Sequence, residues 1–132
     1  MSEPVLLAIL FADRVITENT NKKGIIGTFD KFISSIFPAS FPAWAIYVAV
    51  TNITGNHTFR IILTHVDTNT VILPINGDLN SSGLEQSIEL TFNLTGIPFP
   101  YSGKYNLSVY IDNDLIGSRV LLVEELKNPE MG

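Results

Sequence analysis

The chain has 132 residues and a formal net charge of −5, with 45% apolar and only 16% charged residues. A length near the commonest domain size predicts a single domain, and the high apolar content excludes an intrinsically disordered chain. Because the eight basic residues are scattered, the composition argues against a nucleic-acid or membrane partner, which would need a concentrated basic stripe.

The first predicted element is the apolar run Val5 to Ala12, which follows Glu3 and precedes Asp13 and Arg14. Eight residues are too few for a membrane span, and a signal peptide would begin with basic residues. The run therefore predicts a buried strand, and we expect a cytoplasmic protein. Cysteine is absent, so the chain has neither disulfides nor thiolate metal sites, and we expect no cofactor.

Alternation of apolar and polar residues dominates the rest of the chain. In "KYNLSVYID" the side chains of Tyr105, Leu107, Val109 and Ile111 share one face, and polar residues occupy the other. This pattern is typical of an antiparallel sheet with one wet face. Turn residues separate eight predicted strands, at about 5–17, 24–32, 44–51, 58–66, 70–75, 86–94, 103–112 and 115–123.

These strands predict an all-β fold, an antiparallel two-sheet β-sandwich of about eight strands with immunoglobulin-like or related topology. The sandwich domain is expected over residues 1–126, followed by a flexible tail at 127–132. "GKY" at the start of the seventh strand resembles a tyrosine corner, with Tyr105 bonded back to the preceding loop, and Trp44 resembles the core tryptophan of such domains. A transthyretin-like or calcium-lipid-binding-type sandwich fits almost as well.

Three segments together resemble a family of small bacterial all-β proteins of unknown function: "ADRVITENTNKKGIIGTFDKF", "FPASFPAWAIYVAVTN" and "LTGIPFPYSGKYNLSVYIDNDLIGS". The likeness spans nearly the whole chain. It implies a β-sandwich of about this length in the cytoplasm. It implies no activity, and it brings no catalytic residues with it.

Residues with catalytic potential are few. His65 falls on the inward face of its predicted strand and is expected to be a hydrogen-bonded histidine at the core margin, while His57 is expected in a loop. No Gly-x-Ser-x-Gly nucleophile motif is present, although a Ser-His-Asp triad assembled in space is invisible in sequence. We therefore predict that the protein is not an enzyme.

Acidic turns offer a candidate calcium site. Asp78, Asp112 and Asp114 lie in turn-like segments, where Asp and Asn also bond their own backbone. If every strand reverses direction, these three residues and Glu18 lie at one end of the sandwich. The spacing of a twelve-residue calcium loop is absent, so these are weak candidates.

The same alternation brings "ISSIFPASFP" and "GIPFPYSG" together at the opposite end. These loops either form a lid that keeps water from the core or expose an apolar patch for a partner. The lid is the favoured interpretation. The residues of the possible patch are Ile36, Phe37, Phe41, Phe99 and Tyr101.

The functional hypothesis is a non-enzymatic interaction module that associates with itself, for example as a homodimer, or with another protein. The surface involved is expected to be a sheet edge or the Phe/Pro-rich end. The alternative is a module that binds calcium or a small ligand through the acidic loops.

Overall fold

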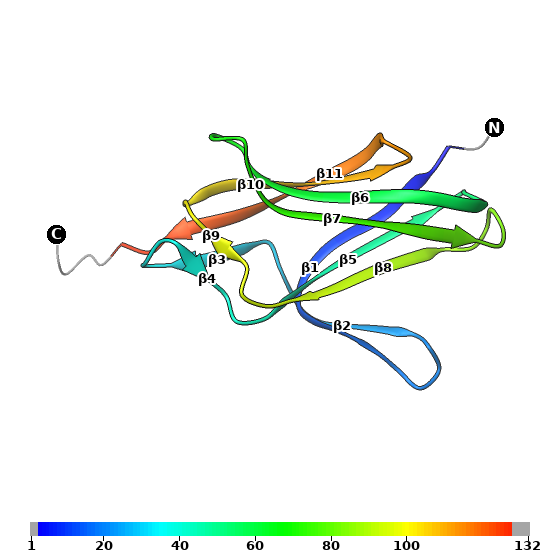
Figure 1. Cartoon of the computed structure of the whole chain (residues 1–132). Helices are drawn as coiled ribbons and strands as arrows, with labels where there is room; N and C mark the ends of the chain where they lie inside the picture. Colours follow the sequence, from blue (N-terminus) through cyan, green and yellow to red (C-terminus); the bar gives the residue numbers. More distant parts are fainter. Residues whose placement is uncertain (1–2, 128–132) are drawn as a thin grey trace.

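The structure is a computed structural model that describes residues 3–127. These residues form two stacked β-sheets and a short two-stranded ladder at one end, with no helix (Figure 1). The predicted all-β, two-sheet sandwich is therefore confirmed. No helix within the described part of the chain is long and apolar enough to cross a membrane. The predicted tail at 127–132 lies outside the described residues except for Lys127.

Sheet A has the strand order β2-β1-β5-β8, sheet B has the order β3-β11-β10-β6-β7, and the short ladder pairs β4 with β9. All pairs are antiparallel except that of β3 with β11, which is parallel. The strands are β1 (Val5–Thr17), β2 (Lys23–Phe29), β3 (Lys31–Ser34), β4 (Ala39–Ser40), β5 (Trp44–Thr51), β6 (Gly55–His65), β7 (Thr70–Ser81), β8 (Ile88–Leu94), β9 (Pro98–Phe99), β10 (Gly103–Ile111) and β11 (Asp114–Glu125).

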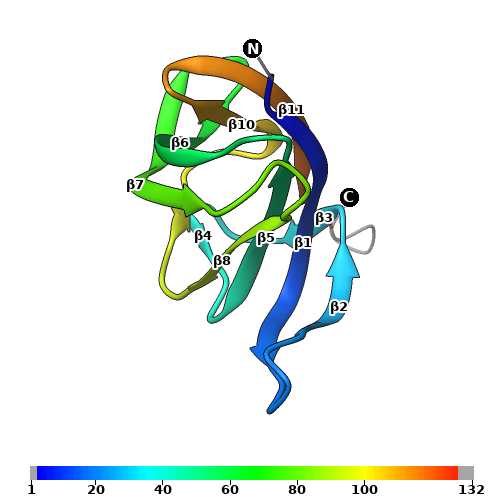
Figure 2. The same ribbon diagram turned by 90° about the vertical axis from the view of Figure 1, so that its right-hand side faces the viewer.

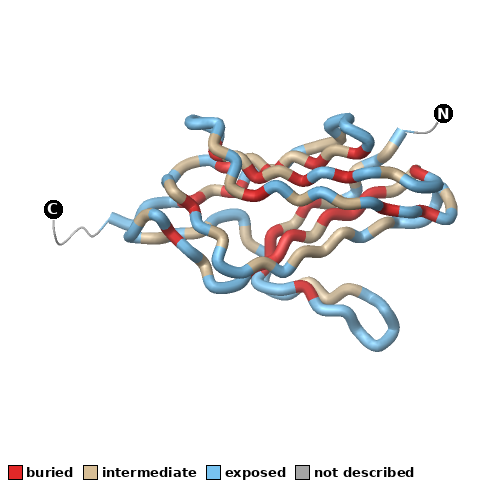
Figure 3. Tube along the Cα trace, in the orientation of Figure 1, coloured by how far each residue is buried: buried red, intermediate tan, exposed pale blue. Residues whose placement is uncertain are grey.

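The core lies between the two sheets and is filled by alternate residues of each strand, as the buried segments in Figure 3 show. Tyr105, Leu107, Val109 and Ile111 of β10 all point into it, as their spacing predicted. Because successive side chains of a strand point to opposite faces, this set fixes the orientation of the neighbouring strands through the register.

All eight predicted strands are present, but the second one is divided into two strands. The segment predicted at 24–32 is divided at Asp30, where the chain leaves sheet A and reverses to run beside β11 in sheet B. The Asp30 carbonyl accepts a hydrogen bond from the Leu122 amide, which fixes the turn. This reversal adds one change of direction that the simple alternation of strands did not include.

The extra reversal corrects one predicted grouping. Val5 pairs with Thr51, so β1 begins where β5 finishes and runs away from the β10–β11 turn that holds Asp112 and Asp114. Glu18, in the turn after β1, lies at the tip of a hairpin that projects from sheet A, so it is not grouped with Asp112 and Asp114 (Figure 1). Asp78 is also not in a loop, because β7 continues through "NGD" to Ser81.

β1 and β2 continue past the body of sheet A as a two-stranded projection, which we call the arm (residues 13–27; Figure 2). β5 begins at Trp44, opposite position 13, so the later residues of β1 have no strand beside them on that side. The side chain of Asn93 on β8 replaces the missing strand there. Its amide oxygen accepts a bond from the Val15 N–H and its amide nitrogen donates to the Val15 carbonyl, each at 3.3 Å.

The two sheets approach each other along β1 and β11, where, within residues 3–127, β1 has no partner strand on its β2 side before Phe11. Arg119 of β11 donates to the Ile9 carbonyl at 2.5 Å, and its guanidinium lies 5.4 Å from the centre of the Phe11 ring. A cation over an aromatic face is favourable, and the free carbonyl gains a charged donor. Arg119 therefore closes this side of the sandwich.

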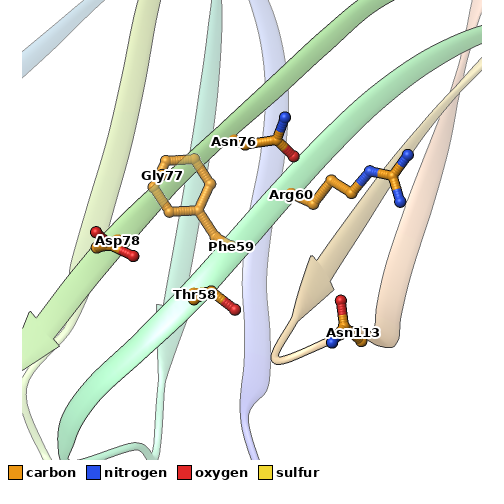
Figure 4. A pocket seen from close by; sticks show the side chains of 7 residues that line it. All are labelled: Thr58, Phe59, Arg60, Asn76, Gly77, Asp78 and Asn113. Carbon is orange, nitrogen blue, oxygen red and sulfur yellow. The ribbon is translucent and has the colours of Figure 1, made fainter.

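Phe59 of β6 packs across Gly77 of β7, its pairing partner (Figure 4). A β-carbon at Gly77 would come within 2.6 Å of two atoms of the Phe59 ring, which is closer than atoms in contact allow. Glycine is thus required here by space and not by backbone conformation.

We expect Gly77→Ala to lower the free energy of unfolding by about 1–3 kcal/mol, the usual cost of overpacking a core. The measurement is the urea midpoint followed by circular dichroism. Gly83→Ala is the matched control, because a β-carbon at Gly83 meets nothing within 4 Å. Equal midpoints for both variants would contradict the packing role of Gly77.

Candidate functional site

The two Phe/Pro-rich loops meet at one end of the sandwich, as predicted. Ala39 pairs with Phe99 and Ser40 with Pro98, which forms the short β4–β9 ladder. Phe99 is fully buried and contacts the rings of Trp44 and Tyr105 below it. The loops are therefore joined across the open end of the core.

Phe41 and Phe37 lie partly buried above this layer. The Phe41 ring stacks on Phe32 of β3 at 3.9 Å between centroids. By contrast, Ile36 is 73% and Tyr101 47% exposed. The five residues of the predicted patch thus do not form one exposed surface: Phe99 and its neighbours close the core, and only Ile36 and Tyr101 face solvent.

Tyr105 forms the predicted tyrosine corner beneath this lid. Its hydroxyl donates to the Tyr101 carbonyl at 2.6 Å and accepts a bond from the Tyr101 N–H at 3.2 Å. His65 lies beside it, with Nδ1 hydrogen-bonded to the Thr68 hydroxyl and Nε2 to the Ser102 carbonyl. The prediction of a hydrogen-bonded histidine at the core margin is confirmed. The indole N–H of Trp44 is the one buried side-chain donor without a partner among residues 3–127.

The predicted acidic residues are found at the opposite end. Asp112 and Asp114 line a shallow hollow with Glu3 and His57, and Asp78 lines a neighbouring hollow with Asp112. Within residues 3–127, no three His, Asp or Glu side chains are arranged to hold a metal ion. The acidic side chains share a surface without converging on a point.

His57, on β6 and not in a loop, makes the most specific contacts at this end. Its Nδ1 bonds the Asp112 carboxylate and its Nε2 bonds the Thr54 carbonyl at 2.7 Å. Asp112 also accepts a bond from the Thr58 amide at 3.0 Å. Because both ring nitrogens face acceptors, the doubly protonated imidazolium suits the site, and neither nitrogen is free to act as a base.

Each member of this pair stabilises the charged form of the other. The hydrogen bond from Asp112 raises the pKa of His57, with the Thr54 carbonyl as the second cause. The hydrogen bonds from His57 and from the Thr58 amide lower the pKa of Asp112. The arrangement is that of a surface ion pair that ties the β10–β11 turn to β6.

The outer face of sheet A was not identified from sequence as a candidate site. Trp44, Ile46, Val48 and Val50 of β5 point into the core, so the alternate residues point outward. The register places these beside the outward residues of β1, and nearly all of them are apolar. The outer face of sheet A comprises Val5, Leu7, Ala8, Leu10, Ala12, Ala45, Tyr47, Ala49 and Thr51.

This face is exposed where its side chains are large. Val5 is 45% and Leu7 51% exposed, and Leu10 and Tyr47 are partly exposed, while Ala12, Ala45 and Ala49 are buried and Ala8 is partly buried. The Tyr47 hydroxyl donates to Glu89 of β8, and burial followed by this bond raises the pKa of Tyr47 to about 12. The hydroxyl therefore stays neutral, and none of the nine residues of the face carries a charge.

The acidic residues gather where β5 finishes. Glu3, Glu85, Asp112 and Asp114 lie there, and we call this part the acidic end. The arm is more balanced, since it holds Arg14, Lys22 and Lys23 against Asp13 and Glu18. No Lys or Arg occurs in the segments that build that end, residues 3–13, 51–59, 82–90 and 111–118.

Comparison with known proteins shows the family to which the chain belongs. A family of unknown function, DUF6941, matches over residues 7–124. The chain belongs to the DUF6941 family. No curated protein matches it in sequence. The predicted resemblance to a family of unknown function is confirmed.

Solved structures show which fold this DUF6941 chain has. It is similar to the CARDB domain of a Pyrococcus furiosus protein, solved in complex with di-metal ions, with a TM-score of 0.51 and 13% identity over 92% of this chain and 88% of that one. It is also similar to a β-D-glucoside glucohydrolase from Trichoderma reesei, with a TM-score of 0.50 and 11% identity; there it covers 92% of itself but only 19% of the enzyme. At such identities the likeness supports the immunoglobulin-like sandwich alone.

We expect Tyr105→Phe to destabilise the fold by about 0.5–1.5 kcal/mol, because a buried hydrogen bond is lost and the Tyr101 backbone loses its partner. Thermal and urea unfolding measure the change. Tyr110→Phe serves as the control, because Tyr110 has the same side chain on the same strand but is only partly buried. An equal loss in the two variants would contradict a tyrosine corner at Tyr105.

We expect the His57–Asp112 pair to stabilise the fold most strongly between about pH 4 and pH 6.5. The raised pKa of His57 makes its contribution complete below its ordinary value of 6.5 and lost as the pH rises through the raised value. The lowered pKa of Asp112 makes its contribution present above its ordinary value of 3.8 and lost as the pH falls through the lowered value.

Asp112→Asn tests this by keeping the shape and removing the charge. The difference in unfolding free energy between wild type and variant should be largest inside this pH range, and NMR titration should show a lower His57 pKa in the variant. Asp114→Asn, in the same turn, should change neither quantity. A His57 pKa that is the same in wild type and in Asp112→Asn would refute the pair.

Proposed function

We propose that this DUF6941 protein is a non-enzymatic association module that binds a second copy of itself through the outer face of sheet A. One observation carries the proposal: the two central strands of sheet A are apolar on both of their faces. A strand that meets water on one side normally alternates apolar with polar residues, and continuous apolar runs are typical of strands covered on both sides.

The continuity of the face supports a binding role. Eight residues of β5 span about 26 Å, and β1 and β5 together span about 10 Å, which gives roughly 260 Å². Beside them, the outward residues of β8 are Glu89, Thr91 and Asn93. A contiguous apolar patch that approaches the largest ones on monomeric proteins is often functional. Sheet B differs, because its outward positions on β10 are Lys104, Asn106, Ser108 and Tyr110.

A second copy suits this face because the same apolar surface serves on both copies of an isologous pair. None of its nine residues on β1 and β5 carries a charge, so no like charges of these residues oppose each other. The geometry of His57, with both ring nitrogens engaged, supports a role without catalysis. The Pyrococcus domain is in complex with di-metal ions, but no comparable cluster occurs among residues 3–127, so metal binding is not part of the proposal.

Sedimentation velocity over about 1–200 μM tests the proposal, because interfaces of modest size associate in the micromolar range. We expect a monomer–dimer equilibrium. Leu7→Glu combined with Leu10→Glu should yield monomer with an unchanged circular dichroism spectrum, since charges would be buried at the centre of the interface.

Leu115→Glu combined with Val120→Glu is the matched control, because these two residues are 58% and 43% exposed on the outer face of sheet B. The control should dimerise as the wild type does. A wild type that stays monomeric throughout the range, or a dimer that the Leu7 and Leu10 changes leave intact, would overturn the proposal.

A further inference from the structure

The sandwich is closed along one side and open along the other. β1 and β11 meet on the closed side, where Arg119 joins the two sheets. On the open side sheet A ends at β8 and sheet B ends at β7, and no pairing joins these two strands within residues 3–127 (Figure 1). Each of them therefore has one edge whose backbone N–H and C=O groups face no strand.

The core-facing side chains of β8 are incompletely covered. Ile88, Leu90, Phe92 and Leu94 point toward the core and pack against it, yet all four are partly exposed. Their four register partners on β5 are only 0–1% exposed. Burial is thus lost within one strand of the edge, and a further strand beside β8 would restore it.

Sheet B provides a cover for such a strand. Phe59 of β6 meets Phe92 of β8 at 6.0 Å between ring centroids, so β6 lies opposite β8. β7 follows β6 in the order of sheet B and lies beyond β8, at the left margin of the molecule in Figure 2. Ile75 of β7 packs toward the core and is partly exposed. In the described part of the chain sheet A has no strand opposite β7, so a strand added to β8 would lie beneath β7.

β8 also lacks the features by which proteins protect a free edge from other strands. Residues 88–94 contain no proline, glycine or lysine, and their register with β5 is continuous. The single charged residue, Glu89, accepts a hydrogen bond from Tyr47 of β5 and is therefore directed away from the free edge. The backbone of β8 is thus accessible to a further strand along its whole length.

The other free edges of the two sheets are protected. β7 carries Pro74, which has no N–H to donate, and its register with β6 shifts after Leu63. β2 contains Gly24 and Gly27, the second with a φ of 71° that departs from strand geometry. β3 has only four residues. Among residues 3–127, β8 is the one free edge that is regular over seven residues.

We infer that β8 binds an extended segment of another protein, which becomes a further strand of sheet A beneath β7. An extended chain is the ligand whose N–H and C=O groups match those of a free edge. Alternate side chains of the segment are apolar and cover Leu90 and Phe92, and the others are polar, with a basic residue near Glu89. This site goes beyond the proposed self-association, because the free edge of β8 is separate from the outer face formed by β1 and β5.

A second copy of the chain does not fit this edge. If β8 paired with β8 of another copy, β7 of each copy would occupy the place of β6 in the other, because β7 extends past β8 in both. The bound segment must therefore have no second layer stacked on it. This condition describes a segment that is unfolded before it binds.

A titration followed by NMR tests the inference. The probe is a capped peptide of about nine residues in which valine alternates with lysine and threonine. We expect the amide signals of residues 88–94 to shift. Exchange of the β8 amides with deuterium should slow at every second residue, since only the groups that face away from β5 gain a partner. A peptide with the same side chains, methylated at its central backbone nitrogens, should have neither effect.

Charge reversal provides a second readout. Glu89→Lys should weaken binding of the lysine-containing peptide about threefold, because an exposed charge pair contributes modestly. Asp78→Lys makes the same change in charge on β7, the other edge of the open side, and should bind the peptide as the wild type does. Circular dichroism checks that both variants fold. An equal loss in the two variants would contradict a site on β8.

Other results overturn the inference in distinguishable ways. No shift at β8 with up to about 1 mM peptide, or shifts there without slower exchange, would reject strand addition and leave the proposed self-association standing. Slower exchange at β8 that grows with protein concentration in the absence of peptide would identify a second copy as the occupant. The variant with Leu7→Glu and Leu10→Glu should still bind the peptide. Peptide binding by a wild type that never dimerises would reject the proposed function alone.

Discussion

The register between β1 and β5 is the constraint on which the rest of the structure depends. Both strands are apolar on both faces, so polarity cannot decide which face points inward. Size decides instead: Trp44, Ile46 and Val48 are bulky, whereas their outward neighbours Ala45 and Ala49 are small. A slip of one residue would put alanines into the core and leave it with cavities, at several kcal/mol for each large side chain lost. The alternation of large and small side chains therefore sets the register, and the register creates the outer face.

The strands could be predicted from sequence wherever polarity alternates. β8 and β10 are examples, and their boundaries agree within about two residues. The reversal at Asp30 could not be predicted, because "GTFDKF" reads as one continuous strand and the turn depends on a backbone bond to Leu122, distant in the chain. The β4–β9 ladder was hidden for a similar reason, since two residues on each side carry no period. "NGD" was interpreted as a turn, yet in β7 its glycine makes room for Phe59.

The candidate sites also include features that sequence patterns predict and features that depend on contacts distant in the chain. The meeting of the two Phe/Pro-rich loops followed from counting strand directions, and so did the separation of Asp112 from the aromatic end. Which aromatic residues were buried could not follow, because Phe99 packs against Phe32 and Phe41, which come from other segments of the chain. The outer face was missed because "VLLAILFA" was interpreted as a buried strand and "WAIYVAV" as a strand, without asking what would cover their second face. The sequence alone allowed that question to be asked.

The bond between Asn93 and Val15 has a consequence for which residues position 93 tolerates. One planar group there supplies a donor and an acceptor to the same backbone residue, as a neighbouring strand would. Aspartate offers two acceptors and would repel the Val15 carbonyl, and leucine, of similar shape, offers neither bond. Only a carboxamide reproduces both, so the angle at which the hairpin leaves the body is held by the chemistry of a single side chain.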